Sequence, residues 1–148
     1  MIQQTEAFDY ALLRVVPRID RGETLNAGVM LYCRARRYLG ARVHLDADRL
    51  RMLDPTADIT AIEDALQTVA AICVGDATAG PAITLDLGQR FRWLAAPRST
   101  VIQASPTHTG LTTDPEAEVG RLLRLLVLPP TIPVTTPRPP LLARCRPT

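Results

Sequence analysis

Hydrophobic and polar residues follow two different spacings along this chain, and the change between them separates predicted strands from predicted helices. Residues 8–17, 25–34 and 38–45 are rich in β-branched, aromatic or alternating apolar residues, which is typical of β-strands. Because short connections join these three segments, we expect them to form an antiparallel meander. Residues 90–94 and 99–104 are predicted to be two further strands.

Helical spacing appears in three other segments. Residues 47–53 predict a short helix that ends near Pro55. Asp58 can cap a second helix, whose apolar residues recur at steps of three and four as far as Gly75. Asp114 and Pro115 are expected to open a last helix. The fold class is therefore predicted to be α+β: an antiparallel sheet of about five strands with the helices packed on one face.

The composition divides the chain of 148 residues into a domain and a tail. Residues 1–128 suit a single domain and hold 14 arginines against 15 acidic residues, a net charge of −1. Residues 129–148 hold seven of the 13 prolines, three arginines and no acidic residue. Proline disfavours helices and central strands, so this tail is predicted to be disordered or extended. A Pro-rich segment with arginines can also bind an aromatic-lined groove.

Alternation along the meander predicts one aliphatic face and one face of tyrosines and cations. The members of this second face are Tyr10, Arg14, Tyr32, Arg34, Tyr38, Arg42 and His44. Such a face can stack bases and hold phosphates, or it can meet a protein, because tyrosine and arginine are enriched in interfaces. It can equally be a half-hydrated surface of an antiparallel sheet. The balance of arginines and acids gives nucleic-acid binding only weak support.

The stretch "APRSTVIQASPTHTG", residues 95–109, concentrates polar side chains around a short apolar pair. Arg98 with the hydroxyls and amides of Ser99 and Thr100 can hold an anion. His108 is the candidate acid or base, because histidine titrates near neutrality. The remaining candidate binding residues of the stretch are Gln103 and Thr109. The alternative is an edge strand bracketed by Pro97 and Pro106, with hydroxyls that satisfy turn backbones.

The sequence lacks the residue patterns of metal, cofactor and Walker-type phosphate-binding sites. Two isolated histidines and three scattered cysteines predict no metal site, and no motif predicts a cofactor. The chain contains no lysine, which excludes Walker-type phosphate binding and Schiff-base chemistry. Cys33 and Cys73 are expected in the core, and an odd cysteine count favours a reducing cytosol. We expect no signal peptide and no membrane segment, and therefore a cytoplasmic protein.

Two stretches resemble the bacterial domain of unknown function 3037: "YALLRVVPRIDRGETLNAGVMLYCRARRYLGARVHLD" and "RFRWLAAPRSTVIQASPTHTGL". The resemblance covers residues 8 to about 127. It implies a small cytosolic bacterial protein without an assigned activity, often encoded beside HipA-like kinases. The family has no established catalytic residues, so the resemblance assigns no catalytic role to any position of this chain. The first hypothesis is a non-enzymatic protein-interaction or regulatory module that partners such a kinase. The alternative is a nucleic-acid-binding protein or a phosphate-directed enzyme that uses the Arg98–His108 segment, so enzymatic activity stays open.

Overall fold

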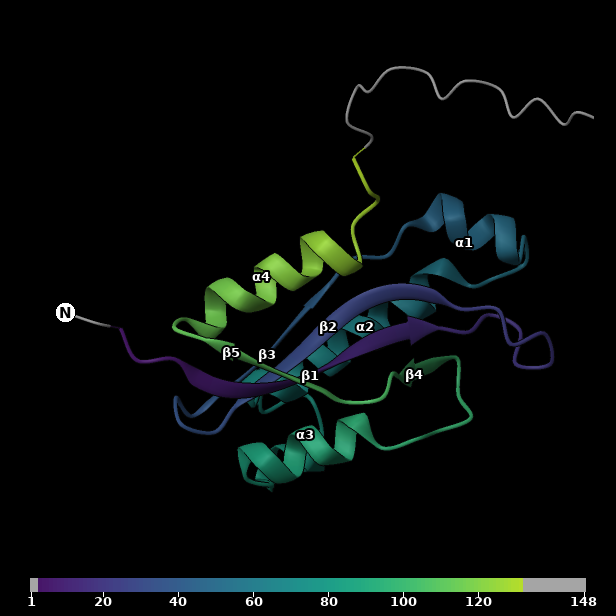
Figure 1. Ribbon diagram of the computed structural model, residues 1–148. Coiled ribbons are helices and arrows are strands. Elements are labelled where there is room, and N and C mark those ends of the chain that lie inside the picture. Colours follow the sequence, from purple (N-terminus) through teal and green to yellow (C-terminus); the bar gives the residue numbers. More distant parts are fainter. Residues whose placement is uncertain (1–2, 132–148) are drawn as a thin grey trace, which may run out of the picture.

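The computed structural model describes residues 3–131 and consists of a single sheet with helices on both of its faces (Figure 1). The strands are β1 (Glu6–Val15), β2 (Leu25–Cys33), β3 (Tyr38–Val43), β4 (Ile102–Ala104) and β5 (His108–Thr112). The helices are α1 (Ala47–Leu53), α2 (Ile59–Val74), the short 3-10 helix η1 (Pro81–Thr84), α3 (Leu87–Ala95) and α4 (Pro115–Leu126).

The predicted α+β class and the five-stranded antiparallel sheet are confirmed. The meander is also confirmed, since β2 pairs with β1 on one side and with β3 on the other. Both β4 and β5 pair with the remaining edge of β1, one after the other along its length. Two short strands therefore share one side of a single long strand.

Three of the helices begin at the aspartates that the sequence offers as helix caps. The carboxylates of Asp46, Asp58 and Asp114 each accept a hydrogen bond from the first turn of the helix that follows. Gly75 ends α2 with a left-handed backbone (φ 76°), the conformation that glycine adopts without strain.

One element prediction was wrong, and a second was correct only in part. Residues 90–94 belong to helix α3, because Asp86 and Gln89 form a capping box that starts a helix at Leu87. The predicted strand over 99–104 is shorter, and the fifth strand is instead β5, which begins at His108. The count of five strands was therefore correct although one of the predicted strands is helical.

An irregularity in β2 changes which residues share a face. Leu13 pairs with Gly28 and Arg14 pairs with Asn26, so Ala27 is an extra residue in the ladder, a β-bulge. Past the bulge, Met30 and Tyr32 point to the face that carries Leu13, whereas Leu31, which lies between them, points to the other face. A strict alternation over residues 25–33 was therefore the wrong assumption.

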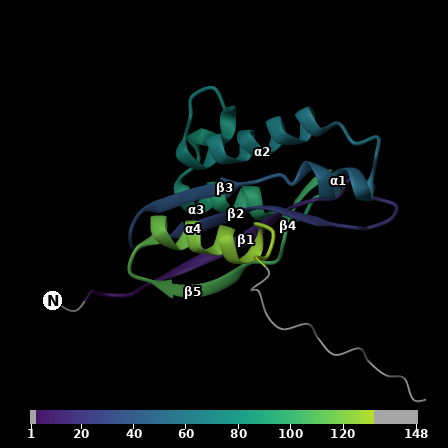
Figure 2. The same ribbon diagram turned by 90° about the horizontal axis from the view of Figure 1, so that it is seen from above.

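Helices cover both faces of the sheet, which corrects the expectation that they pack on one face. Residues of α1, α2 and α3 join one buried cluster with Leu13, Met30 and Leu39. Val119 and Leu122 of α4 join a second cluster with Phe8, Val29 and Leu31 on the opposite face. Figure 1 shows α4 and α3 on opposite sides of the strands, and Figure 2 shows α4 lying over the strands from above. The sheet is thus the middle of three layers.

Cys33 and Cys73 lie in the two buried clusters, as predicted. Burial raises the pKa of the Cys73 thiol to about 12, so this thiol stays protonated and is a poor nucleophile at neutral pH. The predicted tail over 129–148 lies, from residue 132 onward, outside the described residues. Over residues 3–131, no helix is both long enough and apolar enough to cross a membrane.

Candidate functional site

The predicted face of tyrosines and cations forms only in part, because Tyr10, Tyr38 and Arg42 share the face under α4. Tyr32 lies on the face covered by α2 and α3, where its ring stacks on Phe91 with centroids 5.7 Å apart. Tyr38 and Arg42 lie on the opposite face, under α4. The cause is the β2–β3 register, which pairs Tyr38 with Cys33 and therefore places Tyr38 on the face opposite Tyr32.

Tyr38 and Arg42 instead fasten the start of α4 to β3. The Tyr38 hydroxyl donates to Glu116 Oε2 (2.7 Å), and the Arg42 guanidinium donates to Glu116 Oε1 (2.6 Å). These two groups hold the pKa of Glu116 below its ordinary value. Burial, and then the nearby carboxylate, raise the pKa of Tyr38. The three side chains therefore form a structural clamp between β3 and α4.

Replacement of Glu116 by glutamine is expected to remove part of the acid sensitivity of folding. A carboxylate whose pKa is lowered by folding stabilises the protein above its unfolded pKa, and this contribution is lost as the pH falls through the folded value. The stability advantage of the wild type over Glu116→Gln should therefore shrink as the pH falls below about 4.5, the ordinary value for glutamate. Urea unfolding from pH 7 to pH 3 measures it. A difference that stays constant over this range would contradict the clamp.

The side chains of the Arg98–His108 stretch do not form one cluster, because Arg98 and His108 contact different neighbours. Arg98 lies over the Trp93 ring, with its Cζ atom 4.5 Å from the ring centroid, and donates to the Trp93 carbonyl. His108 is exposed on β5, and its ring lies 5.3 Å from that of Tyr10, on the α4 side of the sheet. The shared pocket expected for Arg98 and His108 is not formed.

The other candidate residues make short-range contacts or lie in solvent. Thr100 donates to the Ile102 carbonyl, and Gln103 donates to the Thr100 carbonyl, so both serve a turn. Thr109 donates from β5 to the Asp9 carboxylate on β1 (2.8 Å). Ser99 and His44 are exposed, and Arg14 is half-buried on β1.

Ser105, in the middle of the same stretch, is a buried part of the sheet. Its hydroxyl accepts a hydrogen bond from the Leu12 N–H (2.8 Å) and donates to the Pro106 carbonyl (2.9 Å). Its own N–H donates to the Leu12 carbonyl. One side chain therefore bridges the gap between β4 and β5, where backbone pairing with β1 is interrupted.

Two hollows remain as candidate binding sites. The first, which we call the α2–β4 groove, has a volume of about 650 Å³ and includes Arg98 and Thr100 of the predicted stretch. Its apolar lining consists of Pro17, Ala57, Ala61, Ile62, Ala65, Val69, Val101 and Ile102. Its polar lining consists of Asp54, Thr56, Asp58, Arg98 and Thr100. The small residues at 57, 61 and 65 recur at helical spacing, a signal that the sequence analysis missed.

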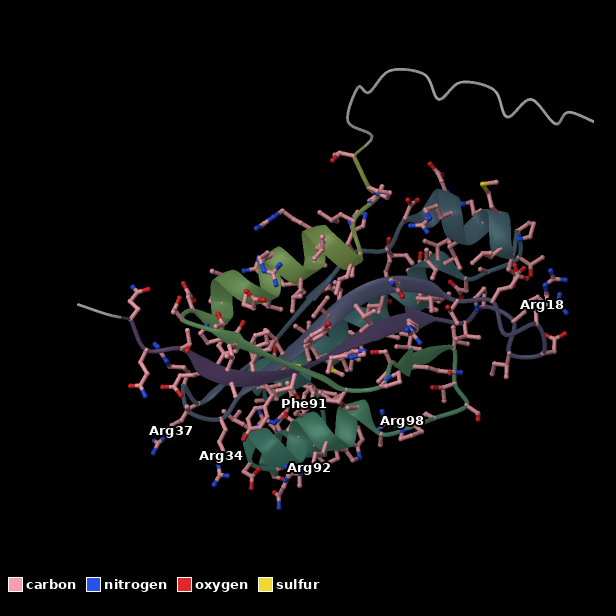
Figure 3. All side chains as sticks on the ribbon, in the orientation of Figure 1. Arg18, Arg34, Arg37, Phe91, Arg92 and Arg98 are labelled. Atoms are coloured by element: carbon pink, nitrogen blue, oxygen red, sulfur yellow. The ribbon has the colours of Figure 1, made fainter. Side chains whose placement is uncertain are left out.

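The second hollow, which we call the arginine groove, has a volume of about 840 Å³. It lies at the opposite end of α3 from Arg98 (Figure 3). It is lined by Ala7, Phe8, Asp9, Tyr32, Arg34, Arg37, Asp86, Leu87, Gly88 and Arg92. Sequence reasoning named Tyr32 and Arg34 but placed them on a different surface, and it missed Arg37 and Arg92.

A metal centre is not found in the described part of the chain. Within residues 3–131, no three histidine, cysteine or carboxylate side chains lie close enough together to hold a metal ion. The two grooves offer apolar surface, arginine and aspartate side chains, and in the arginine groove also the Tyr32 side chain.

Comparison with known proteins identifies the family. No curated protein and no solved structure matches the chain. A family model described as a protein of unknown function, DUF3037, matches residues 10–127. That span contains the sheet from Tyr10 onward, every helix of the described residues, the α2–β4 groove, the Glu116 clamp and the arginine groove except for its lining residues 7–9. The chain therefore belongs to the DUF3037 family.

Proposed function

We infer that this chain is a non-enzymatic protein-interaction module whose α2–β4 groove binds an apolar segment of a partner protein. The observation that carries this proposal is the lining of the groove, where aliphatic side chains from a helix and an edge strand face an open hollow. Exposed apolar surface of this kind, bordered by polar residues, is typical of protein-binding sites.

The small side chains of α2 give the groove its width. Ile62 and Leu66 point into the core, while Ala61 and Ala65 are exposed one turn apart on the adjoining surface. An alanine extends only to its Cβ atom, so another segment can approach the helix closely. The opposite wall is Val101, which is 38% exposed, together with Ile102 of β4.

Charge at the border of the groove favours a basic residue in the bound segment. Asp54 ends α1 and Asp58 caps the start of α2, and both line the groove beside its apolar wall. Hydrogen bonds from the hydroxyl and N–H of Thr56 hold the pKa of Asp54 below its ordinary value, so it is ionised at neutral pH. Arg98, the cation of this border, lies over Trp93. We therefore propose an apolar segment flanked by arginine or lysine.

The separation of the candidate chemical groups supports binding over catalysis. His108 lies on the α4 side of the sheet, away from Arg98, and the Cys73 thiol is buried and protonated. A general acid or base acts only within hydrogen-bonding reach of its substrate and its partners. The phosphate-directed enzyme built on Arg98 and His108 therefore lacks geometric support.

Ala61→Arg is expected to abolish partner binding, because a long charged side chain would fill the apolar groove. Arginine is a good helix former, and Ala61 is exposed, so the fold should be retained. The partner to test is a HipA-like kinase, the class that the family resemblance implies. Co-purification and titration of the two purified proteins should show at least roughly tenfold weaker binding.

Gln67→Arg is the matched control. Gln67 is exposed on α2 outside the groove, and its replacement adds the same charge to the same helix. Equal binding by both variants and the wild type would show that the groove is not the interface. Absence of any complex between the wild-type chain and the kinase would reject the proposed partner.

A further inference from the structure

We propose that the arginine groove binds a phosphate monoester group, carried either by a small molecule or by a phosphorylated side chain. The proposal concerns a different surface from the α2–β4 groove. It rests on three arginines, a tyrosine hydroxyl and a helix start that converge on one hollow.

Two chain segments bring the arginines together. Arg34 and Arg37 lie in the turn between β2 and β3, and Arg92 lies on α3. Arg37 has a left-handed backbone (φ 48°), which is uncommon for a residue other than glycine and shapes the turn. Figure 3 shows Arg34, Arg37 and Arg92 at the same end of the molecule.

These three arginines make no ion pair within residues 3–131. The arginines that do are elsewhere: Arg18, Arg21, Arg42, Arg51 and Arg121. A guanidinium group carries five N–H donors in a planar array that suits phosphate oxygens. The groove therefore holds three guanidinium groups that form no ion pair with any acidic side chain in the described part of the protein.

The two acidic residues of the lining are engaged within the protein. Asp9 accepts a hydrogen bond from Thr109 (2.8 Å), and Asp86 accepts one from the N–H of Gln89 at the start of α3 (2.8 Å). Asp86 therefore serves the helix, and Asp9 serves the pairing of β1 with β5. Three arginines against two aspartates leave the lining with a net positive charge.

Gly88 marks the point at which the donors converge. A Cβ atom at this position would lie 3.0 Å from the Tyr32 hydroxyl and 3.2 Å from Nη1 of Arg92, so both groups face the bare backbone. The Tyr32 hydroxyl has no hydrogen-bond partner among residues 3–131, and stacking on Phe91 fixes its ring. Leu87 and Gly88 lie in the first turn of α3, and their N–H groups, unlike the Gln89 N–H that donates to Asp86, have no acceptor within the helix. An anion can use all of these donors.

The chemistry favours a phosphate monoester over a carboxylate. A monoester presents three acceptor oxygens and a charge near −2 at neutral pH, which matches donors that come from several directions. The groove, at about 840 Å³, has room for a group larger than inorganic phosphate. A nucleic-acid polymer is disfavoured, because residues 1–128 carry a net charge of −1 and offer no broad basic surface.

Titration of the full chain with four probes tests the ligand class. The probes are inorganic phosphate, adenosine monophosphate, a phosphoserine peptide and the same peptide with glutamate in place of phosphoserine. We expect a monoester to bind at least roughly tenfold more tightly than the glutamate peptide. Preference for the nucleotide or for the phosphopeptide identifies the source of the monoester, and either outcome supports the proposal.

Gly88→Ala tests the location, because its methyl group would occupy the point of convergence. Gly120→Ala is the matched control: it makes the same change within α4, where the added Cβ meets only the Arg124 side chain at 3.6 Å. Alanine is a better helix former than glycine, so both variants should keep their fold by circular dichroism. Gly88→Ala should weaken monoester binding roughly tenfold or more, while Gly120→Ala should leave it unchanged.

Arg92→Gln, compared with Arg124→Gln on α4, supplies a second test of the same kind. Loss of roughly tenfold in affinity is expected for Arg92→Gln alone. The proposal is overturned if no monoester binds, if neither Gly88→Ala nor Arg92→Gln weakens binding, or if an oligonucleotide binds more tightly than every monoester. Ala61→Arg should leave monoester binding intact, so failure at this groove is distinguishable from failure at the α2–β4 groove.

Discussion

Replacement of Arg90 by methionine is expected to lower the free energy of unfolding by about 3 kcal/mol, because it removes several charge-assisted hydrogen bonds. Arg90 is 8% exposed and lies on α3. Its guanidinium donates to the carbonyls of Cys73 (3.2 Å), Ile83 (2.8 Å) and Leu85 (3.1 Å). Cys73 is in the last turn of α2, where the helix dipole favours a cation. One side chain thus joins α2, η1 and α3.

Urea unfolding of Arg90→Met and of Arg92→Met measures this effect. Arg92 is exposed on the same helix, so its replacement should change the free energy of unfolding by no more than about 0.5 kcal/mol. Methionine fills much of the space of the arginine stem, which isolates the loss of the guanidinium group. Equal free energies of unfolding for the two variants would show that the hydrogen bonds from Arg90 to the three carbonyls do not stabilise the protein.

Ser105→Ala is expected to cost about 2 kcal/mol, because it leaves a buried donor without its acceptor. The Ser105 hydroxyl accepts from the Leu12 N–H on β1, where neither β4 nor β5 supplies a backbone carbonyl. Ser105 is 3% exposed and Leu12 is buried, so water cannot readily replace the hydroxyl. Thermal unfolding measures the cost.

Hydrogen exchange of the Leu12 amide provides a local measurement of the same change. This amide should exchange faster in Ser105→Ala than in the wild type, and Ser105→Thr, which keeps a hydroxyl, should restore part of the protection. Ser99→Ala is the control, since Ser99 is exposed and outside every strand. An unchanged exchange rate in Ser105→Ala would show that the hydroxyl does not satisfy this donor.

Much of the fold was predictable because its signals are local. β-Branched, aromatic and alternating apolar residues marked the three strands of the meander. Asp58, Gly75 and the Asp114–Pro115 pair marked the ends of helices through hydrogen bonds within a few residues. These strand and helix signals depend on residues close together in the sequence, so tertiary contacts do not change them.

The errors come from patterns that only tertiary contacts resolve. The sequence Arg-Phe-Arg-Trp-Leu alternates like a strand, yet Phe91 and Leu94 also lie three residues apart and share the buried side of α3. The capping box at Asp86 and Gln89 was the available sign of a helix. Strand β5 is mostly exposed and lacks an apolar pattern, so pairing with β1 alone defines it.

The candidate sites were predictable only in part. The isolated Gly28 was a sign of a bulge in β2, and the bulge places Met30 and Tyr32 on the same face as Leu25 and Ala27. The arginine groove combines the β2–β3 turn with α3, segments separated by about fifty residues, and no local spacing links them. Arg98 and Thr100 were named from the sequence and do line a groove, but α2 supplies its apolar wall.

The break at Ser105 has a consequence for how the protein behaves at high concentration. Unpaired strand edges can template the addition of strands from other molecules, which leads to aggregation. Here the outer rim of β1 is occupied by two pieces of three and five residues, separated by a kink that contains Pro106. An incoming strand would meet two short, misaligned lengths instead of one continuous ladder. The interruption that Ser105 bridges therefore also protects this side of the sheet from unwanted self-association.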